Sequence, residues 1–580
     1  MVLFCTIKII GACKPSRFFK IYCNHTIFAM YQDEGAGCRT LVRPEMETKI
    51  EICLHSTVTS HSSRCIRRKR KRTMNYNSMI KEKETVMNHE GAKAYKMTPE
   101  MELYTAVVTS ALSDKYYESN DERMDRIAVL IRQVDPQFVA KLAVYTRTQM
   151  NLRSIPLFLI VELAKIHNGD SLVKRTIEQC VLRADEIMEL LMCYQLRNSE
   201  GKGIKKLSKL SRQVQEGLKS AFNRFDEYQF AKYNRSNLEV KLKDALFIVH
   251  PKASSEAQQE VFDKIVSDTL QTPYTWETQL SELGQKHFDS QEEKQAAVKA
   301  LWEELIDSNK VGYMALLRNL RNILQAQVSP AHIEKVSATI SDPVKVEKSK
   351  QMPFRFLAAY KELMGVESVH TAAVLTALEK AVKQSVNNLE GFGTDTSVLV
   401  AADVSGSMFS PISPRSSVRC YDIGILLSML LKSKCSSVIS GMFGDTWKVL
   451  NLPQENILAN TLEMEKREGE VGYSTNGYKV IEYLIENDIK IDKVMMFTDM
   501  QMWDSRRGDN HIQKIWEQYR QKYPESKLYL FDLSGYGNAP VELTKDNAVL
   551  VSGWSDKVFD VLKAIENGED AIAQINKVEI

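Results

Sequence analysis

The sequence predicts a multidomain protein, with an all-α array of stacked helices over residues 85–390 and an α/β domain with a doubly wound parallel sheet over residues 391–580. Three observations predict this arrangement. The chain has 580 residues, too many for a single hydrophobic core. Helix-start signals and apolar residues at spacings of three and four fill the middle of the chain. After residue 391, short apolar runs alternate with helical patterns, as in doubly wound sheets.

Residues 1–73 form an atypical basic, cysteine-rich extension. They hold 14 Lys and Arg against 5 Asp and Glu, a net charge of +9, and six of the ten cysteines. They show no sustained helical or strand period and end in the basic run at 67–72. That run could be a nucleic-acid tail or a targeting signal. The alternative, which we prefer, is that this extension is absent from the mature protein, with Met74 or Met79 as the real start.

The remaining composition is typical of a globular protein, with 44% hydrophobic and 26% charged residues. No apolar stretch approaches the length of a membrane span, and the first thirty residues lack the layout of a signal peptide. The four cysteines after residue 73 are scattered without metal-ligand spacing, as expected for reduced thiols. We therefore expect a cytoplasmic, monomeric protein without membrane contact.

Helix follows helix from about residue 98 to residue 384. Thr98-Pro99-Glu100 is a start signal that combines a capping hydroxyl, a first-turn proline and an acid, and Ser329-Pro330 repeats it. Asp135-Pro136 and Ile155-Pro156 punctuate the region between. Short polar joints between helices of 10–18 residues favour paired-helix repeats stacked in a HEAT-like manner.

Within this region, residues 196–244 hold 12 Lys and Arg against 6 Asp and Glu, a net charge of +6. Basic groups neutralise phosphates and aromatic rings can stack on bases, so the segment could bind RNA. The alternative is a solvated helix face with core aromatics. The first basic group is Lys202, Lys205, Lys206, Lys209 and Arg212. The interleaved aromatics are Phe222, Phe225, Tyr228, Phe230 and Tyr233.

The α/β domain contains a set of oxygen-bearing residues at the ends of predicted strands. Strands are expected near 398–402, 438–443, 494–498, 528–533 and 549–552. Open α/β sheets place ligand-binding loops at the carboxyl ends of strands, and hydroxyls with few carboxylates suit Mg²⁺ better than zinc. The alternative is an Asp-Ser turn that caps a helix, with an unrelated second acid. The candidate ligands are Asp403, Ser405, Ser407, Thr475 (or its neighbour Ser474) and Asp499.

This DxSxS … T … D pattern resembles the metal-ion-dependent adhesion site of von Willebrand factor A domains, which have a Rossmann-like fold. The resemblance covers about 190 residues and implies a divalent cation, Mg²⁺, bound by Asp403, Ser405, Ser407, Thr475 and Asp499.

The helical region resembles the TROVE module of the Ro autoantigen and bacterial Rsr family, in which a ring of HEAT-like helices precedes a von Willebrand A domain. The stretches that carry the likeness are 88–95 (NHEGAKAY), 97–104 (MTPEMELY), 142–147 (LAVYTR), 152–156 (LRSIP), 243–252 (KDALFIVHPK), 315–320 (ALLRNL) and 353–360 (PFRFLAAY).

This second resemblance implies RNA binding without catalysis. Small noncoding Y-like RNAs and misfolded RNAs with free 3′ ends would be the partners, together with an exoribonuclease for which the protein serves as a scaffold. The positions that match the family's RNA-binding surface are Lys232, Tyr233, Arg235 and His250, and Lys252 flanks them.

A second class of function is a protein-interaction module, in which a partner's carboxylate completes the metal shell. A hydrolase is poorly supported, because the sequence contains no evident Ser-His-Asp arrangement, P-loop or zinc motif. We therefore expect a protein that is not an enzyme.

Overall fold

The structure is a computed structural model of the 580-residue chain. It divides into two compact units, residues 1–80 and 81–580. The residues that the structure describes are 85–110, 117–198, 209–234, 239–385, 396–411, 418–435, 437–503, 511–543, 547–553, 558–567 and 570–580, with the backbone of three strands in the first unit.

The first unit contains three antiparallel strands in the order β1-β2-β3. They are β1 (Phe18–Cys23), β2 (Thr26–Asp33) and β3 (Ala36–Thr40). The sequence shows no sustained strand period here, so these strands were not predicted. None of the three alternates polar and apolar residues strictly, and without that alternation a short strand gives little signal.

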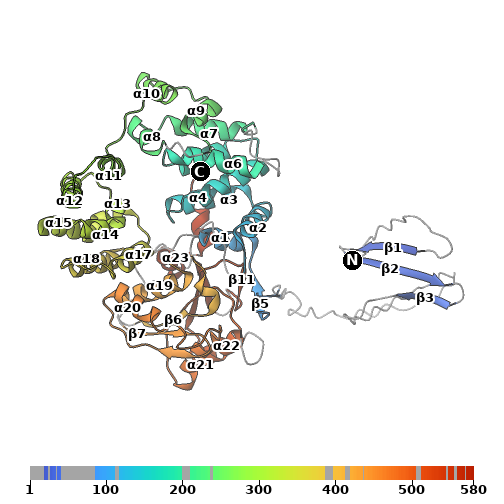
Figure 1. The fold of residues 1–580 in the computed structure, drawn as a ribbon. Helices are drawn as coiled ribbons and strands as arrows, with labels where there is room; N and C mark the ends of the chain where they lie inside the picture. The colour runs from blue at the N-terminus through green and yellow to red at the C-terminus, as the bar shows by residue number, and fades with distance from the viewer. Residues whose placement is uncertain are drawn as a thin grey trace. The chain divides into compact units, whose positions relative to one another are not determined.

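The second unit begins with a hairpin and continues as the predicted array of helices (Figure 1). The hairpin strands are β4 (Thr85–Met87) and β5 (Lys93–Lys96). The helices are α1 (Pro99–Val108), α2 (Asn120–Ile131), α3 (Pro136–Thr148), α4 (Ser154–Ile166), α5 (Leu172–Cys180), α6 (Asp185–Asn198), α7 (Arg212–Phe222), α8 (Glu227–Tyr233), α9 (Leu242–Val249), α10 (Glu256–Ser267), α11 (Trp276–Gly284), α12 (Gln291–Asp307), α13 (Tyr313–Arg318), α14 (Leu320–Gln325), α15 (Pro330–Ser341), α16 (Pro343–Ser349), α17 (Pro353–Leu363) and α18 (Thr371–Gln384).

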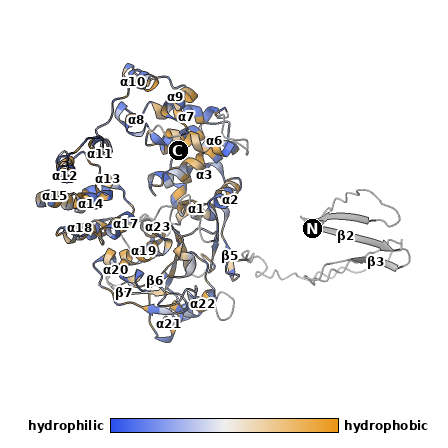
Figure 2. Ribbon diagram, in the orientation of Figure 1, coloured by the Kyte–Doolittle hydropathy of each residue, from blue (hydrophilic) through white to orange (hydrophobic). Residues whose placement is uncertain are grey.

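The predicted start signals are where the helices begin. The Thr98 hydroxyl accepts a hydrogen bond from the Met101 N–H, and Pro99 is the first residue of α1. Asp135 caps α3 in the same way, and α15 begins at Pro330. Polar and apolar residues alternate along these helices, and their apolar faces pack on neighbours two or three elements away (Figure 2). The approach can be close, since a Cβ added at Gly217 of α7 would lie 2.8 Å from the Cβ of Ile177 of α5.

The α/β domain is a six-stranded sheet in the order β12-β10-β9-β6-β7-β8. Five of its strands are parallel and match the five predicted from sequence, so the doubly wound sheet is confirmed. The edge strand β8 was not predicted and is antiparallel, because only residues 444–446 separate it from β7. The strands of this sheet are β6 (Ser397–Asp403), β7 (Ser437–Phe443), β8 (Trp447–Val449), β9 (Lys493–Thr498), β10 (Lys527–Asp532) and β12 (Ala548–Ser552). A further short strand of the domain, β11 (Asn538–Ala539), pairs with β5 instead.

Helices cover both faces of this sheet. Along β6, Val398 and Val400 join the core that contains α19, while Leu399 and Ala401 join the core that contains α21 and α22. Successive strand residues point to opposite faces, so a strand buried on both sides reads as a continuous apolar run. The helices are η2 (Gly406–Phe409), α19 (Cys420–Lys434), α20 (Ile457–Glu465), α21 (Tyr478–Glu486), α22 (Ile512–Lys522), α23 (Val558–Glu566) and α24 (Ala571–Asn576).

The α/β domain contacts both ends of the helical array. At the beginning of the array, β11 pairs with β5, α1 packs on β12, and α24 packs on α3. At its end, α17 packs on α19 and α18 on α20. The α/β domain therefore bridges the two ends of the helices and closes a ring with them. None of the helices that the structure describes is long and apolar enough to cross a membrane.

Candidate metal centre and nucleic-acid interface

The predicted oxygen ligands meet at the carboxyl edge of two central strands. Asp403 is the last residue of β6, Asp499 follows β9 directly, and these strands pair in parallel. Ser405 and Ser407 lie in the turn and short helix η2 that leave β6. Parallel neighbours end at the same edge of a sheet, which is why ligands about a hundred residues apart in sequence come together.

Hydrogen bonds among its own residues hold this edge in place. The Ser405 N–H donates to Asp403 Oδ1 over 2.9 Å, and the hydroxyls of Ser405 and Ser407 are 3.3 Å apart. Thr498 donates its hydroxyl to Asp403 Oδ2 over 2.6 Å. All of these side chains are buried. These hydrogen bonds therefore hold the oxygen atoms in position, and burying the carboxylate charge costs free energy of folding.

The choice between Ser474 and Thr475 depends on where each hydroxyl lies. Thr475 is 3% exposed, and its hydroxyl donates to the carbonyl of Gln501 over 2.9 Å. Ser474 is half-buried, and its N–H and hydroxyl both engage Asp445. This arrangement favours Thr475 as the ligand, which stays a prediction.

Burial raises the proton affinity of both carboxylates. Burial raises the pKa of Asp403 and of Asp499, and the charge of Asp403 raises the pKa of Asp499 further. Asp499 Oδ2 is buried and makes no hydrogen bond of ordinary geometry with a described residue, although the nearby Ser407 hydroxyl lowers the pKa of Asp499 and so offsets part of the rise. A buried acceptor without an ordinary hydrogen bond, beside a second carboxylate and several hydroxyls, fits a divalent cation that keeps some of its waters.

The same edge offers no alternative set of metal ligands. Among the described residues, no group of three or more His, Cys, Asp and Glu is placed to hold a metal ion. A cation at Asp403 and Asp499 would therefore depend on hydroxyl oxygens, as the sequence pattern predicts.

An exposed tyrosine and two half-buried residues, one aromatic and one basic, lie beside these ligands. Tyr473, which is 52% exposed, contacts the ring of Phe409 with centroids 5.8 Å apart. The guanidinium of Arg419 lies 4.9 Å from the centre of the Phe409 ring. We call Phe409, Arg419 and Tyr473 the aromatic rim.

The residues predicted to bind RNA lie at the ends of short helices. Of the ten, those described are Lys209, Arg212, Lys232, Tyr233, His250 and Lys252. Lys202, Lys205, Lys206 and Arg235 lie outside the described residues.

Lys232 and Tyr233 end α8 and form part of a mixed basic and aromatic cluster. The Lys232 ammonium lies 5.8 Å from the ring centre of Tyr228 and 5.7 Å from that of Tyr233. The guanidinium of Arg183 lies 4.6 Å from the Tyr233 ring. Arg183 belongs to the turn before α6, and nothing in the sequence linked it to this cluster.

A groove of about 430 Å³ runs beside this cluster. Lys232, Tyr233 and Asn234 line one side, and the connection between α10 and α11 lines the other with Gln271, Thr272 and Thr275. Sequence reasoning missed this second side, because its residues carry neither charge nor a motif.

His250 and Lys252 are exposed and lie in the loop after α9. His250 adopts the left-handed conformation that ends this helix, with φ of 50°. Asn223 at the end of α7 holds the loop, because its amide donates to the Lys252 carbonyl over 3.0 Å and its carbonyl accepts from Ser254 N–H over 2.8 Å. The loop therefore presents both side chains to solvent from a fixed backbone.

The interleaved aromatics divide into two groups. Phe222, Phe225 and Phe230 are almost fully buried and pack on one another, so these three do not stack bases. Tyr228 is 49% exposed and Tyr233 is half-buried. The alternative of core aromatics is correct for the phenylalanines, because Phe222 and Phe230 lie on the buried faces of α7 and α8 and Phe225 packs on Phe230 from the connecting turn.

Two family models match this chain. The TROVE domain matches residues 54–300 and 266–392, and the Ro60 vWA domain matches residues 397–565. The chain belongs to the TROVE family. Its fold is similar to that of the crystal structure of the Deinococcus radiodurans RO (RSR) protein, with a TM-score of 0.53 and 18% identity over 81% of this chain and 100% of that one.

More distant sequence relatives include two much longer proteins. Telomerase protein component 1 of Rattus norvegicus is 25% identical over 312 residues, and that of Mus musculus is 24% identical over 344 residues. The alignments cover 40% and 45% of this chain but only 11% and 13% of those proteins.

Proposed function

We propose that this protein is an RNA-binding component of a ribonucleoprotein and that it is not an enzyme. Membership of the TROVE family carries the proposal. The exposed Lys232, Tyr228 and His250 support it, because cations neutralise phosphates and accessible rings can stack bases. The rodent relatives are named as a protein component of telomerase, and membership of a larger assembly is consistent with this proposal.

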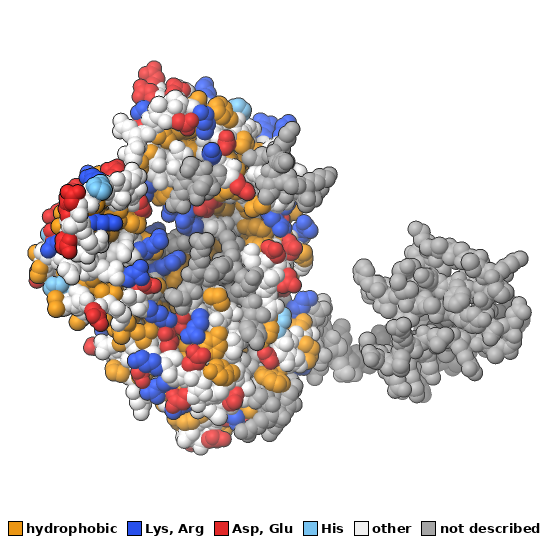
Figure 3. Space-filling model, viewed as in Figure 1, with side chains coloured by type: hydrophobic (Ala, Val, Ile, Leu, Met, Phe, Trp, Pro, Cys, Tyr) orange, Lys and Arg blue, Asp and Glu red, His pale blue; other side chains and the backbone are white. Residues whose placement is uncertain are grey.

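The RNA class that we propose is a small noncoding, Y-like RNA or a misfolded RNA with a free 3′ end. The helical ring supports this choice, since Lys and Arg side chains gather around a hollow on the face seen in Figure 3. Recognition would then depend on RNA shape and an accessible strand rather than on a base sequence. In this role the protein would act in the cytoplasm, in RNA quality control or as a scaffold for an exoribonuclease.

We propose further that Asp403, Ser405, Ser407, Thr475 and Asp499 hold one Mg²⁺, directly or through water. The buried Asp499 Oδ2, which makes no hydrogen bond of ordinary geometry with a described residue, supports this site. The cation would neutralise two carboxylates that burial otherwise disfavours.

A binding assay tests the RNA proposal. Residues 74–580 are titrated with a structured RNA that bears a single-stranded 3′ tail, with the same RNA without the tail, and with a single strand alone. Tight binding of the tailed RNA that weakens steeply with salt is expected. Absence of binding at low salt would contradict the proposal, and sequencing of crosslinked RNA from cells would identify the natural ligand.

The aromatic rim favours a second candidate function, metal-dependent binding of a protein. A partner carboxylate could complete the cation shell while its apolar side chains contact Phe409 and Tyr473. If the chain binds no structured RNA but captures a protein only with Mg²⁺ present, this second function replaces the first.

A further inference from the structure

Gln501 contacts two of the predicted metal ligands and is fully buried. Its N–H donates to Asp499 Oδ1 over 3.1 Å, and its carbonyl accepts the Thr475 hydroxyl over 2.9 Å. It follows Met500, a buried residue held at φ of +67°. The turn after β9 is therefore in a conformation that needs support from its surroundings.

The side chain of Gln501 connects this turn to another part of the fold. Its Oε1 accepts the N–H of His89 over 2.8 Å, and its Nε2 donates to Asn538 Oδ1 over 3.3 Å. His89 lies in the turn of the β4–β5 hairpin, and Asn538 begins β11, which pairs with β5. The side-chain amide of Gln501 thus joins the ligand turn both to the hairpin and to β11, the strand that pairs with the hairpin.

A second hydrogen bond joins the same two elements. The buried Asn88 donates its amide to the Met502 carbonyl over 3.0 Å, while its own Oδ1 accepts the N–H of Ala92 across the hairpin turn. The ligand turn and the hairpin are therefore linked by side chains from both directions.

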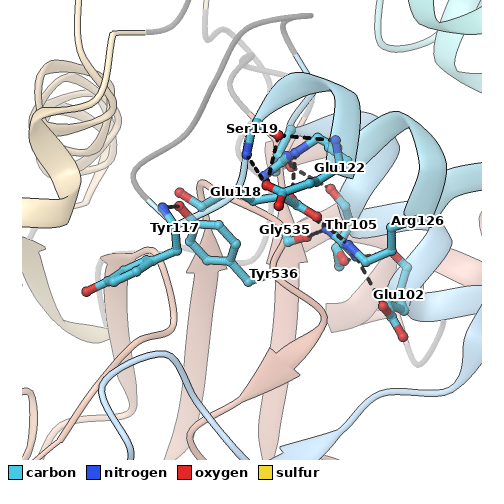
Figure 4. Close-up of polar contacts among 12 residues, drawn as sticks. Glu102, Thr105, Tyr117, Glu118, Ser119, Glu122, Arg126, Gly535 and Tyr536 are labelled. Atoms are coloured by element: carbon cyan, nitrogen blue, oxygen red, sulfur yellow. Dashed lines mark hydrogen bonds and ion pairs between the residues drawn. The ribbon is translucent and has the colours of Figure 1, made fainter.

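Polar groups from the first helices hold the adjacent loop after β10 (Figure 4). Arg126 of α2 donates to the Gly535 carbonyl over 2.7 Å and pairs with Glu102 and Glu118. The ring of Tyr536 packs edge-on against Tyr117 and His89. The hairpin, the first two helices and this loop thus form one connected polar junction, which a displaced hairpin would disrupt.

We propose that Gln501 is a positioning residue for the cation site and that, through it, cation binding and docking of the β4–β5 hairpin stabilise each other. This inference rests on the Mg²⁺ site proposed above. A cation bound by Asp499 and Thr475 would hold both side chains in place. Their hydrogen bonds to the Gln501 backbone would then hold that residue, whose side chain binds the docked hairpin. Coupling between two binding equilibria is reciprocal, so an undocked hairpin weakens the cation site.

The experiment measures Mg²⁺ affinity by calorimetry and hydrogen exchange of residues 85–96 with and without Mg²⁺. In the wild-type chain, Mg²⁺ is expected to slow exchange of the hairpin. Gln501→Ala should lower Mg²⁺ affinity by about 10-fold, as loss of a residue that orients metal ligands commonly does, and should abolish the effect of Mg²⁺ on the hairpin.

Gln513→Ala is the matched control. Gln513 is a buried glutamine of the same domain. Its side-chain carbonyl accepts the N–H of Glu542, which is not part of the ligand turn. This variant should keep both the Mg²⁺ affinity and the protection of the hairpin.

Asn88→Asp tests the coupling from the hairpin side and serves if Gln501→Ala fails to fold. It keeps the acceptor for Ala92 but sets a carboxylate oxygen against the Met502 carbonyl. It should lower Mg²⁺ affinity severalfold without touching a ligand. If wild-type protein binds Mg²⁺ and hairpin exchange is unchanged, or if Asn88→Asp binds Mg²⁺ normally, the coupling is refuted and the cation site stands. If wild-type protein binds no Mg²⁺, both the site and the coupling are refuted.

Discussion

The candidate site of the α/β domain and that of the helical array are built in opposite ways. In the α/β domain, the carboxylates and hydroxyls are buried, and hydrogen bonds fix them at one edge of a sheet. In the array, Lys232 is exposed at the end of α8, and His250 and Lys252 are exposed in the loop after α9. A small cation requires a few oxygens at defined distances, whereas RNA requires positive charge spread over a surface.

This difference teaches where single substitutions should act strongly. Removing one ligand from a preorganised, buried site should eliminate binding, because no other group can move in to replace it. Removing one cation from a dispersed surface should weaken binding gradually, because each contact supplies only part of the affinity.

The largest effect is expected from Asp403→Ala. Mg²⁺ binding measured by calorimetry should be lost, while the free energy of unfolding without Mg²⁺ should fall by no more than about 1 kcal/mol, because the variant also removes a buried charge. Asp492→Ala is the control, since Asp492 accepts from Ser397 at the opposite edge of the sheet. Unchanged Mg²⁺ affinity in Asp403→Ala would contradict the site.

Two aromatic residues separate packing from surface function in the array. Phe222→Ala should lower the free energy of unfolding by about 3–5 kcal/mol, because Phe222 is fully buried. Tyr228→Ala should change it by less than about 0.5 kcal/mol, since Tyr228 is exposed. Denaturant titration of both variants measures this, and a comparable loss in Tyr228→Ala would mean that its ring is structural.

The double variant Lys232→Ala and Arg235→Ala tests the dispersed surface. We expect affinity for a tailed, structured RNA to fall on the order of 10-fold and the slope of log affinity against log salt to shrink by about 2, because two phosphate contacts are lost. Filter binding across a salt series measures both quantities.

Lys286→Ala with Lys294→Ala is the matched control, because these lysines are exposed in the segment of α11 and α12, which is rich in acidic residues. Wild-type affinity and slope in the Lys232 and Arg235 variant would place the RNA elsewhere on the chain.

The smallest effect concerns the junction between the end of the array and the α/β domain. Burial and the charge of Asp422 raise the pKa of Glu465 from 4.5 to about 7, although Lys361 lies 2.9 Å from its carboxylate. A carboxyl with a raised folded-state pKa binds more protons in the folded state, so its contribution to stability falls as pH rises from about 4.5 to 7.

Glu465→Gln cannot ionise and should remove this part of the pH dependence. Between pH 5 and pH 7.5, the wild-type free energy of unfolding should fall relative to that of the variant on the order of 1 kcal/mol. Urea titrations at the two pH values measure the difference, and parallel pH profiles would show that Glu465 does not titrate in this window.

Much of the fold could be predicted because its signals are local. Thr98 and Asp135 predict helix starts, because an N-cap involves only neighbouring residues. The apolar runs of β6 and β9 predict strands that are buried on both faces. The proximity of the candidate cation ligands Asp403 and Asp499 was also predictable, since parallel strands end at a common edge. The pairing of β8 with β7 was missed, although a tight turn separates them.

The sequence by itself indicated most of the helices and the five parallel strands, which strand ends carry the candidate cation ligands, and the family to which the chain belongs. Only the tertiary structure decided that Phe222 is core while Tyr228 is surface, that Arg183 covers Tyr233, and that Gln501 joins the ligand turn to His89. The physical reason is the separation along the chain of the residues that interact. Caps and strand periods arise from neighbours along the chain, whereas burial and contacts between distant residues exist only after the helices have packed against one another and against the sheet.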